Sequence, residues 1–201
     1  EFSEPEPMFD GSLFHVSING SNNDDGSIDN PFLSIQFAYD RADEHDTILV
    51  HPGVYNDDIW FYGKNVVLGS LYLSTGDTSF ISSTIIDGDS TDCTIAIYGN
   101  IDSTCRVTGF TIQNGIGCVY GQGAGIYVES ASPRLDNLII KNNIGGTNGG
   151  GICLNGNSNS LIDKVVIKNN SADTGGGLYS FNSNPVITNS VIQNNHSNNG
   201  A

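Results

Sequence analysis

Short runs of β-branched and other apolar residues, separated by Gly, Asn and Ser, make up most of the chain after residue 100. Four segments align without gaps, at residues 105–115, 133–143, 160–170 and 185–195. Two apolar columns recur at spacings of 28, 27 and 25 residues: Val107, Leu135, Ile162 and Ile187, and then Ile112, Ile140, Ile167 and Ile192. Ile and Val favour strands, and the period is shorter than that of paired-helix repeats. The pattern therefore predicts stacked coils of short strands.

A third column contains only asparagine, at Asn114, Asn142, Asn169 and Asn194. Equivalent positions of stacked coils lie about 4.8 Å apart, so amides in register can hydrogen-bond to one another and to the turn backbone inside the coil. This column predicts an asparagine ladder. Glycine-rich segments at 122–127, 148–153 and 174–179 form a second repeated element, and we expect them to provide unusual dihedral angles or a close backbone approach.

The first sixty residues do not follow the repeat. Residues 14–18 read as a strand, Ser34 as the N-cap of a helix over 35–42, and residues 46–50 as a second strand. A solenoid needs a cover on its first coil, because an open end exposes apolar side chains and strand edges. We therefore predict a flexible lead over residues 1–13, an N-terminal cap over 14–62 and β-helix coils over 63–201, with the last repeat cut off.

The Asn-Pro-Phe-Leu-Ser-Ile-Gln run at 30–36 and the Pro-Gly-Val-Tyr run at 52–55 resemble the N-terminal cap of right-handed β-helix proteins in the pectate-lyase-like superfamily. The later Asn-Asn-Ser-Ala and Gly-Gly-Gly patterns resemble repeats of polymorphic outer-membrane and related bacterial surface proteins. This resemblance implies an all-β, right-handed parallel β-helix of about 25 to 28 residues per coil, with a short N-terminal capping helix. That superfamily includes lyases, hydrolases, adhesins and structural modules, so the fold does not decide the activity.

The composition limits the kinds of partner and site that we expect for this chain. The chain has 22 acidic and 7 basic residues, a formal net charge of −15, which argues against nucleic acid because phosphate binding relies on Lys and Arg. No apolar run approaches the ~20 residues of a membrane-spanning helix. The four cysteines lack zinc-site spacing, and Cys153, aligned with tyrosines, reads as a small buried residue.

The outward columns contain the candidate chemistry. Asp136 and Asp163 share one column, Lys141 and Lys168 share another, and Arg134 lies two positions before Asp136. A lyase that removes the proton next to a uronate carboxylate commonly needs acidic ligands for Ca²⁺ and a Lys or Arg base. Asp136 and Asp163 are therefore candidate calcium ligands, and Lys141, Lys168 and Arg134 candidate catalytic residues. The alternative is that these charges only balance each other on the surface.

Regular repeats without a concentrated site favour a non-catalytic role. We expect a secreted or cell-surface β-helix module for adhesion, carbohydrate contact or structural assembly, as the N-terminal part of a larger protein. One alternative is a calcium-dependent lyase acting on an acidic polysaccharide. The other is a filament subunit that binds another copy through its open C-terminal edge.

Overall fold

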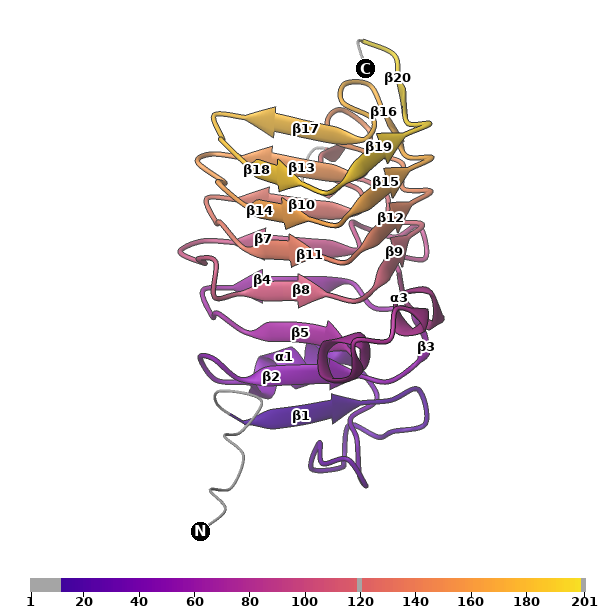
Figure 1. The fold of residues 1–201 in the computed structure, drawn as a ribbon, viewed down its shortest axis with the longest axis vertical. Helices are drawn as coiled ribbons and strands as arrows, with labels where there is room; N and C mark the ends of the chain where they lie inside the picture. The colour runs from indigo at the N-terminus through magenta and orange to yellow at the C-terminus, as the bar shows by residue number, and fades with distance from the viewer. Residues whose placement is uncertain (1–11, 119–120, 200–201) are drawn as a thin grey trace.

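The computed structural model describes residues 12–118 and 121–199. Three parallel sheets run along a solenoid, and the first and last described strands, β1 (Leu13–Val16) and β20 (His196–Ser197), lie at its opposite ends (Figure 1). This is the all-β parallel β-helix predicted from the repeats. Most of the predicted flexible lead, residues 1–11, lies outside the described residues, and Leu13 already belongs to a strand. Among the described helices, none has the length and apolar character needed to cross a membrane.

Each complete coil contributes one strand to each sheet. Sheet A contains β1 (Leu13–Val16), β2 (Thr47–Val50), β5 (Val67–Ser70), β8 (Arg106–Thr108), β11 (Arg134–Asp136), β14 (Leu161–Asp163) and β18 (Val186–Thr188). Sheet B contains β3 (Gly53–Tyr55), β6 (Thr84–Asp87), β9 (Thr111–Gln113), β12 (Ile139–Lys141), β15 (Val166–Lys168) and β19 (Val191–Gln193). Sheet C contains β4 (Ile59–Tyr62), β7 (Ile95–Tyr98), β10 (Ile126–Glu129), β13 (Ile152–Asn155) and β17 (Leu178–Phe181). Two short strands, β16 (Ser171–Ala172) and β20 (His196–Ser197), pair separately.

The strand registers confirm both predicted apolar columns. Leu135 pairs with Val107 and Ile162 in sheet A, and Ile140 pairs with Ile112 and Ile167 in sheet B. All six side chains are fully buried. The two columns therefore form continuous apolar ladders inside the solenoid, and burying them contributes to the driving force for stacking.

The predicted asparagine ladder is wrong by one residue. The predicted column has a left-handed backbone throughout, with φ between 55° and 60° at Asn114, Asn142, Asn169 and Asn194. Asn142 and Asn169 are exposed, whereas the following residues, Asn143 and Asn170, are buried. Asn tolerates the left-handed conformation better than most residues, so the predicted column makes the corner and the next side chain enters the coil.

The actual ladder stacks Asn143, Asn170 and Asn195. The Asn143 side-chain amide donates to Asn170 Oδ1 at 2.9 Å, and the Asn170 amide donates to Asn195 Oδ1 at 3.0 Å. Asn143 Oδ1 also accepts from the Gly115 N–H at 3.0 Å. The ladder thus pairs turn backbone groups that would otherwise be buried without partners.

The glycine-rich segments have both properties expected of them. Gly123, Gly149 and Gly175 have φ values of +57°, +69° and +63°. At Gly125, a Cβ would lie 2.5 Å from the Gly151 carbonyl oxygen of the next coil. Glycine adopts the positive φ values without strain, and at position 125 it leaves room for the neighbouring carbonyl oxygen without a shift of the backbone.

Helix α1 (Ile35–Arg41) covers the N-terminal edge of sheet C. Ser34 is its N-cap, as predicted, and the helix ends one residue before the predicted end. The Trp60 N–H donates to Gln36 Oε1 at 2.7 Å, and the Tyr62 N–H donates to the Tyr39 hydroxyl at 2.7 Å. Side chains of α1 thus bond strand β4 in place of a neighbouring strand, which protects that edge.

Two charged side chains hold the ends of α1. Asp57 Oδ2 accepts from the Ser34 hydroxyl at 2.9 Å and from the Ile35 N–H at 2.7 Å. Lys64 Nζ donates to the carbonyl oxygens of Tyr39 and Ala42, both at 2.8 Å. A carboxylate at the N-terminus and an ammonium at the C-terminus both complement the helix dipole.

Strands β2, β3 and β4 lie inside the predicted cap, residues 14–62, yet pair within sheets A, B and C. The boundary at residue 62 stays a prediction. Two short helices, α2 (Tyr72–Thr75) and α3 (Ser79–Ser83), were not predicted. A Cβ at Gly69 would lie 2.7 Å from the Leu73 side chain, so this glycine lets α2 approach the outer face of sheet A.

The C-terminal end of the described solenoid is open. Ile187 and Ile192 occupy the two ladder positions of the last coil and are 41% and 49% exposed. Their neighbours one coil earlier, Ile162 and Ile167, are fully buried. The last coil therefore presents apolar side chains and unpaired strand edges. Residues 200–201, at the start of the next repeat, lie outside the described residues.

Candidate functional site

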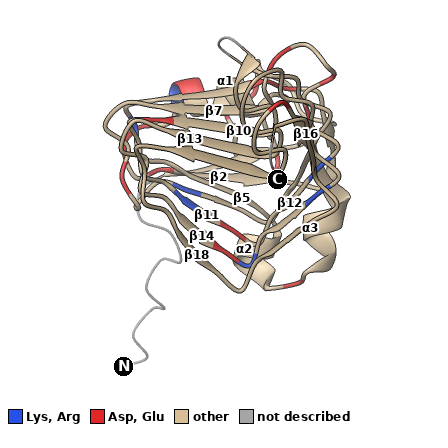
Figure 2. Ribbon diagram, turned by 90° about the horizontal axis from the view of Figure 1, so that it is seen from above, with Lys and Arg blue, Asp and Glu red and all other residues tan. Residues whose placement is uncertain are grey.

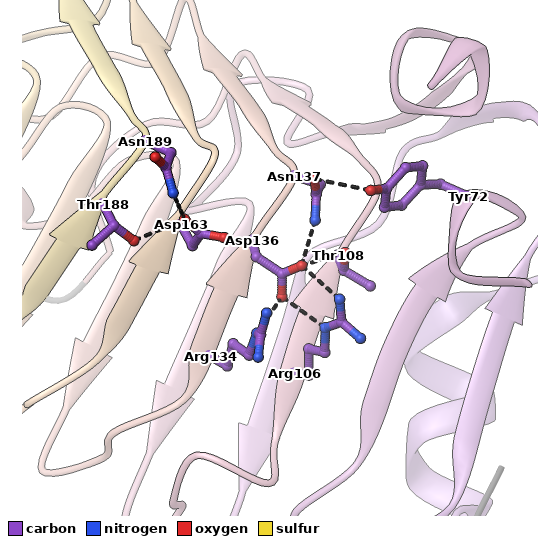
Figure 3. Close-up of polar contacts among 9 residues, drawn as sticks. All are labelled: Tyr72, Arg106, Thr108, Arg134, Asp136, Asn137, Asp163, Thr188 and Asn189. Atoms are coloured by element: carbon purple, nitrogen blue, oxygen red, sulfur yellow. Dashed lines mark hydrogen bonds and ion pairs between the residues drawn. The ribbon is translucent and has the colours of Figure 1, made fainter. Parts of the chain in front are cut away.

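Asp136 lies at the centre of a charged cluster on sheet A (Figure 3). Arg106 donates to both carboxylate oxygens, from Nε at 2.7 Å and from Nη2 at 2.6 Å, and Arg134 Nε donates at 3.0 Å. The Thr108 hydroxyl and the Asn137 side-chain amide also donate to Oδ2. Asp136 is 0% exposed, so its carboxylate is enclosed by donors from its own and the preceding coil.

The electrostatics of this cluster favour an ionised Asp136. Burial by itself would raise the pKa of Asp136, but the hydrogen bonds and charge of Arg106, together with the charge of Arg134, outweigh it and lower the pKa. The same hydrogen bond raises the pKa of Arg106. A cation would meet two guanidinium groups at this carboxylate. The observed contacts therefore favour a brace between coils, the charge-balancing alternative, over calcium ligation.

Asp163 lies beside Asp136 in the β11–β14 pair, as the column predicted. Its Oδ1 accepts from the Thr188 hydroxyl at 2.7 Å and from the Asn189 amide at 2.8 Å. These bonds, with the Asn189 bond the larger effect, lower the pKa of Asp163. Asp163 is thus bonded by donors from the next coil, whereas Arg106 and Thr108 reach Asp136 from the preceding coil.

Lys141 and Lys168 are adjacent on β12 and β15, as predicted, but they belong to sheet B. Figure 2 shows basic residues in blue on β11 and, separately, on β12. Within the described residues, the ion pairs of Asp136 are with Arg106 and Arg134, and neither lysine pairs with Asp136 or Asp163. The structure brings the carboxylates together and the lysines together, but on different sheets. Their assignment as calcium ligands and catalytic residues stays a prediction.

A second cluster, which the sequence reasoning missed, lies on the outer face of sheet C. The rings of Trp60, Tyr62 and Tyr98 are parallel to within 10°. Their centroids are 6.3 Å apart for Trp60–Tyr62, 5.9 Å for Trp60–Tyr98 and 5.3 Å for Tyr62–Tyr98. We call these three residues the aromatic cluster.

The three centroids of the aromatic cluster form a triangle. Carbon atoms in contact are about 3.5 Å apart, so two rings on opposite faces of a third would be about 7 Å apart or more. All three separations are shorter than this, so no ring has both faces covered by the other two. Tyr62 is 58% exposed. The cluster therefore presents aromatic surface to the solvent.

The register explains why the sequence alone did not reveal this cluster. Tyr62 pairs with Tyr98, and Trp60 with Ala96, across a spacing of 36 residues. The next strands of the sheet that were recognised as repeats, β10 and β13, are spaced by 26. Helices α2 and α3 account for the difference because they are inserted between β5 and β6. The sequence did contain one signal of the cluster, because Trp60 and Tyr62 are aromatic residues at alternate positions of one strand.

Cys93 and Cys118 form a disulfide, which was not predicted from the sequence. Together with Ala96, Tyr127 and Cys153 they form a small apolar cluster on the outside of sheet C, packed against Trp60, Tyr98 and Tyr179. Cys153 is a buried free thiol, as expected. Asp92 lies close to both disulfide sulfurs, but sulfurs bonded to each other are not thiolate ligands.

Comparison with known proteins agrees with this architecture. The sequence model of the family described as "right handed beta helix region" matches residues 67–201. Curated proteins and solved structures give no match. The matched segment begins at strand β5 and takes in the repeats from which the fold was predicted. The chain belongs to the right-handed β-helix family.

Proposed function

We propose that this chain is an extracellular β-helix module that contacts carbohydrate through its aromatic cluster. The observation that carries the proposal is the set of three parallel, partly exposed rings of Trp60, Tyr62 and Tyr98. Aromatic rings combine a large apolar face with a polar edge, which suits a sugar ring with C–H groups on its faces and hydroxyls around it.

The disulfide supports an extracellular setting. Disulfides persist in oxidising compartments and are rare in the cytosol, and Cys93 and Cys118 are joined by one.

The test is a binding measurement with the full chain and a panel of neutral and acidic oligosaccharides. We expect binding to at least one member, and at least a tenfold loss of affinity in Tyr62→Ala. Tyr72→Ala is the matched control, because Tyr72 lies on α2 against sheet A. Absence of binding across the panel, or equal affinity of Tyr62→Ala and the parent, would refute the proposal.

The same panel tests the lyase. If the protein only binds, no unsaturated product accumulates in the presence of Ca²⁺. If it is a lyase, product forms, and Lys141→Ala or Lys168→Ala abolishes it. That outcome would replace the binding proposal with the enzymatic one.

A further inference from the structure

A hollow of about 230 Å³ lies farther along sheet C from the aromatic cluster. Its lining consists of three amide side chains and two aromatic rings: Gln122, Asn148, Asn155, Tyr179 and Phe181. Asn155 ends β13, and the two aromatic residues lie on β17. Gln122 and Asn148 precede β10 and β13 and pair with each other in parallel register. We call this the amide hollow.

The amides of the hollow have hydrogen-bonding capacity to spare. Asn155 Nδ2 lies 3.5 Å from the Tyr127 hydroxyl, and Gln122 Oε1 lies 3.9 Å from Cys153 Sγ. Both contacts are long. For Asn148, the described residues provide no side-chain hydrogen bond. Each amide offers two donors and an acceptor, so the hollow suits a ligand whose groups both donate and accept, as hydroxyls do.

Aromatic surface lies beside these amides. Phe181 is 52% exposed although its side chain is wholly apolar, and Tyr179 is partly exposed. Amides that can bond hydroxyls, next to rings that can cover C–H faces, are the two components needed to hold a sugar ring.

The hollow and the aromatic cluster share one row of the sheet. The register aligns Tyr62, Tyr98, Glu129, Asn155 and Phe181 as outward positions on successive strands. Neighbouring strands lie about 4.8 Å apart, so four steps from Tyr62 to Phe181 span about 19 Å along the solenoid axis. A ligand that touches both ends is an oligosaccharide lying along that axis.

The charge of this row selects against acidic glycans. Glu129 is its charged member, and the outward positions of β4, β7, β10, β13 and β17 contain no Lys or Arg. A uronate carboxylate would meet Glu129 and a chain of net charge −15, without a cation in the row to neutralise it. Neutral sugars carry no such penalty.

We propose that the row from the aromatic cluster to the amide hollow binds a neutral oligosaccharide along the solenoid axis. This inference rests on the proposed carbohydrate contact and adds to it a second contact point, a direction and a ligand class. It also differs from the acidic polysaccharide expected of a lyase.

The experiment is isothermal titration calorimetry on the full chain, with cellohexaose and xylohexaose as neutral probes and hexagalacturonate as the acidic probe. We expect a neutral hexaose to bind and hexagalacturonate to bind at least tenfold more weakly. Asn155→Ala and Phe181→Ala should each lower the affinity for the neutral hexaose at least tenfold. Val186→Ala, in the same last coil but on sheet A and 56% exposed, is the matched control and should leave it unchanged.

The outcomes separate the two proposals. If Tyr62→Ala weakens hexaose binding but Asn155→Ala and Phe181→Ala do not, the amide hollow is refuted and the aromatic cluster stands. If none of the three changes the affinity, both are refuted. Stronger binding of hexagalacturonate than of either neutral hexaose would overturn the ligand class. Circular dichroism of each variant shows whether a loss of binding comes from misfolding, and Phe181→Leu then replaces a misfolded Phe181→Ala.

Discussion

The asparagine ladder provides a quantitative test of the architecture, because two adjacent asparagines have opposite environments. Asn143 is buried, and its side chain accepts from the Gly115 N–H and donates to Asn170 Oδ1 and to the Ile112 carbonyl oxygen. Asn142 is exposed and has a left-handed backbone with φ of +57°. We predict that Asn143→Ala is severely destabilising and that Asn142→Gly is nearly neutral.

The magnitude follows from the contacts. Leaving the buried Gly115 N–H without a partner costs about 1–3 kcal/mol, and losing the two bonds that Asn143 donates costs about 0.5–1.5 kcal/mol each. Asn143→Ala should therefore lower the free energy of unfolding by about 2–6 kcal/mol. Asn142→Ala should cost about 1–2 kcal/mol, because alanine is strained in the left-handed region, and Asn142→Gly should remove that strain.

The assay is urea denaturation followed by far-UV circular dichroism. For each variant, the midpoint and the slope are compared with those of the parent, since an unchanged slope indicates that stability alone has changed. The reasoning is refuted if Asn142→Ala destabilises the protein more than Asn143→Ala. It is also refuted if Asn143→Ala costs less than about 0.5 kcal/mol, the size of an ordinary surface effect.

Three further predictions concern the cap and the disulfide. His15 Nδ1 lies 3.1 Å from His51 Nε2. Burial is the larger cause that lowers the pKa of His15, and the charge of His51 is the smaller one. Burial also lowers the pKa of His51. As the pH falls, the unfolded chain therefore binds protons at these histidines before the folded protein does, so the free energy of unfolding should decrease below about pH 6.5. A melting temperature unchanged between pH 7.5 and 5.5 would contradict this. Asp57→Ala should cost about 1–2 kcal/mol by removing the acceptor at the α1 N-terminus, and denaturation of Asp57→Asn should show a smaller loss. The disulfide joins residues separated by 25 positions, so the double variant Cys93→Ala/Cys118→Ala should lose about 2–4 kcal/mol, and a melting curve identical to that of the parent would argue against the bond.

The sequence by itself determined the repeat, its period and the two apolar ladders. Ile112, Ile140 and Ile167 recur at nearly constant spacing because each coil must place one apolar side chain above another, and stacking turns that spacing directly into contact. The N-cap at Ser34 could also be predicted from the sequence, since capping depends on the residues of a single turn. These features are local, or repeat with the chain.

Only the tertiary structure decided which asparagine enters the coil, because the direction of Asn143 depends on the left-handed corner at Asn142. It also decided the role of Asp136. A column of side chains shows that Arg106, Arg134 and Asp136 are neighbours, but not that the carboxylate is buried and bonded by both guanidinium groups.

The aromatic cluster depended on the tertiary structure most of all. Tyr62 and Tyr98 meet only because an irregular insertion is folded out of the way, so that strands 36 residues apart pair in register. The same register sets the spacing from Tyr62 to Phe181 and leaves their row without a basic residue. Repetition in the sequence specifies the solenoid, but the aromatic cluster that we propose to contact carbohydrate forms where the repeat is interrupted.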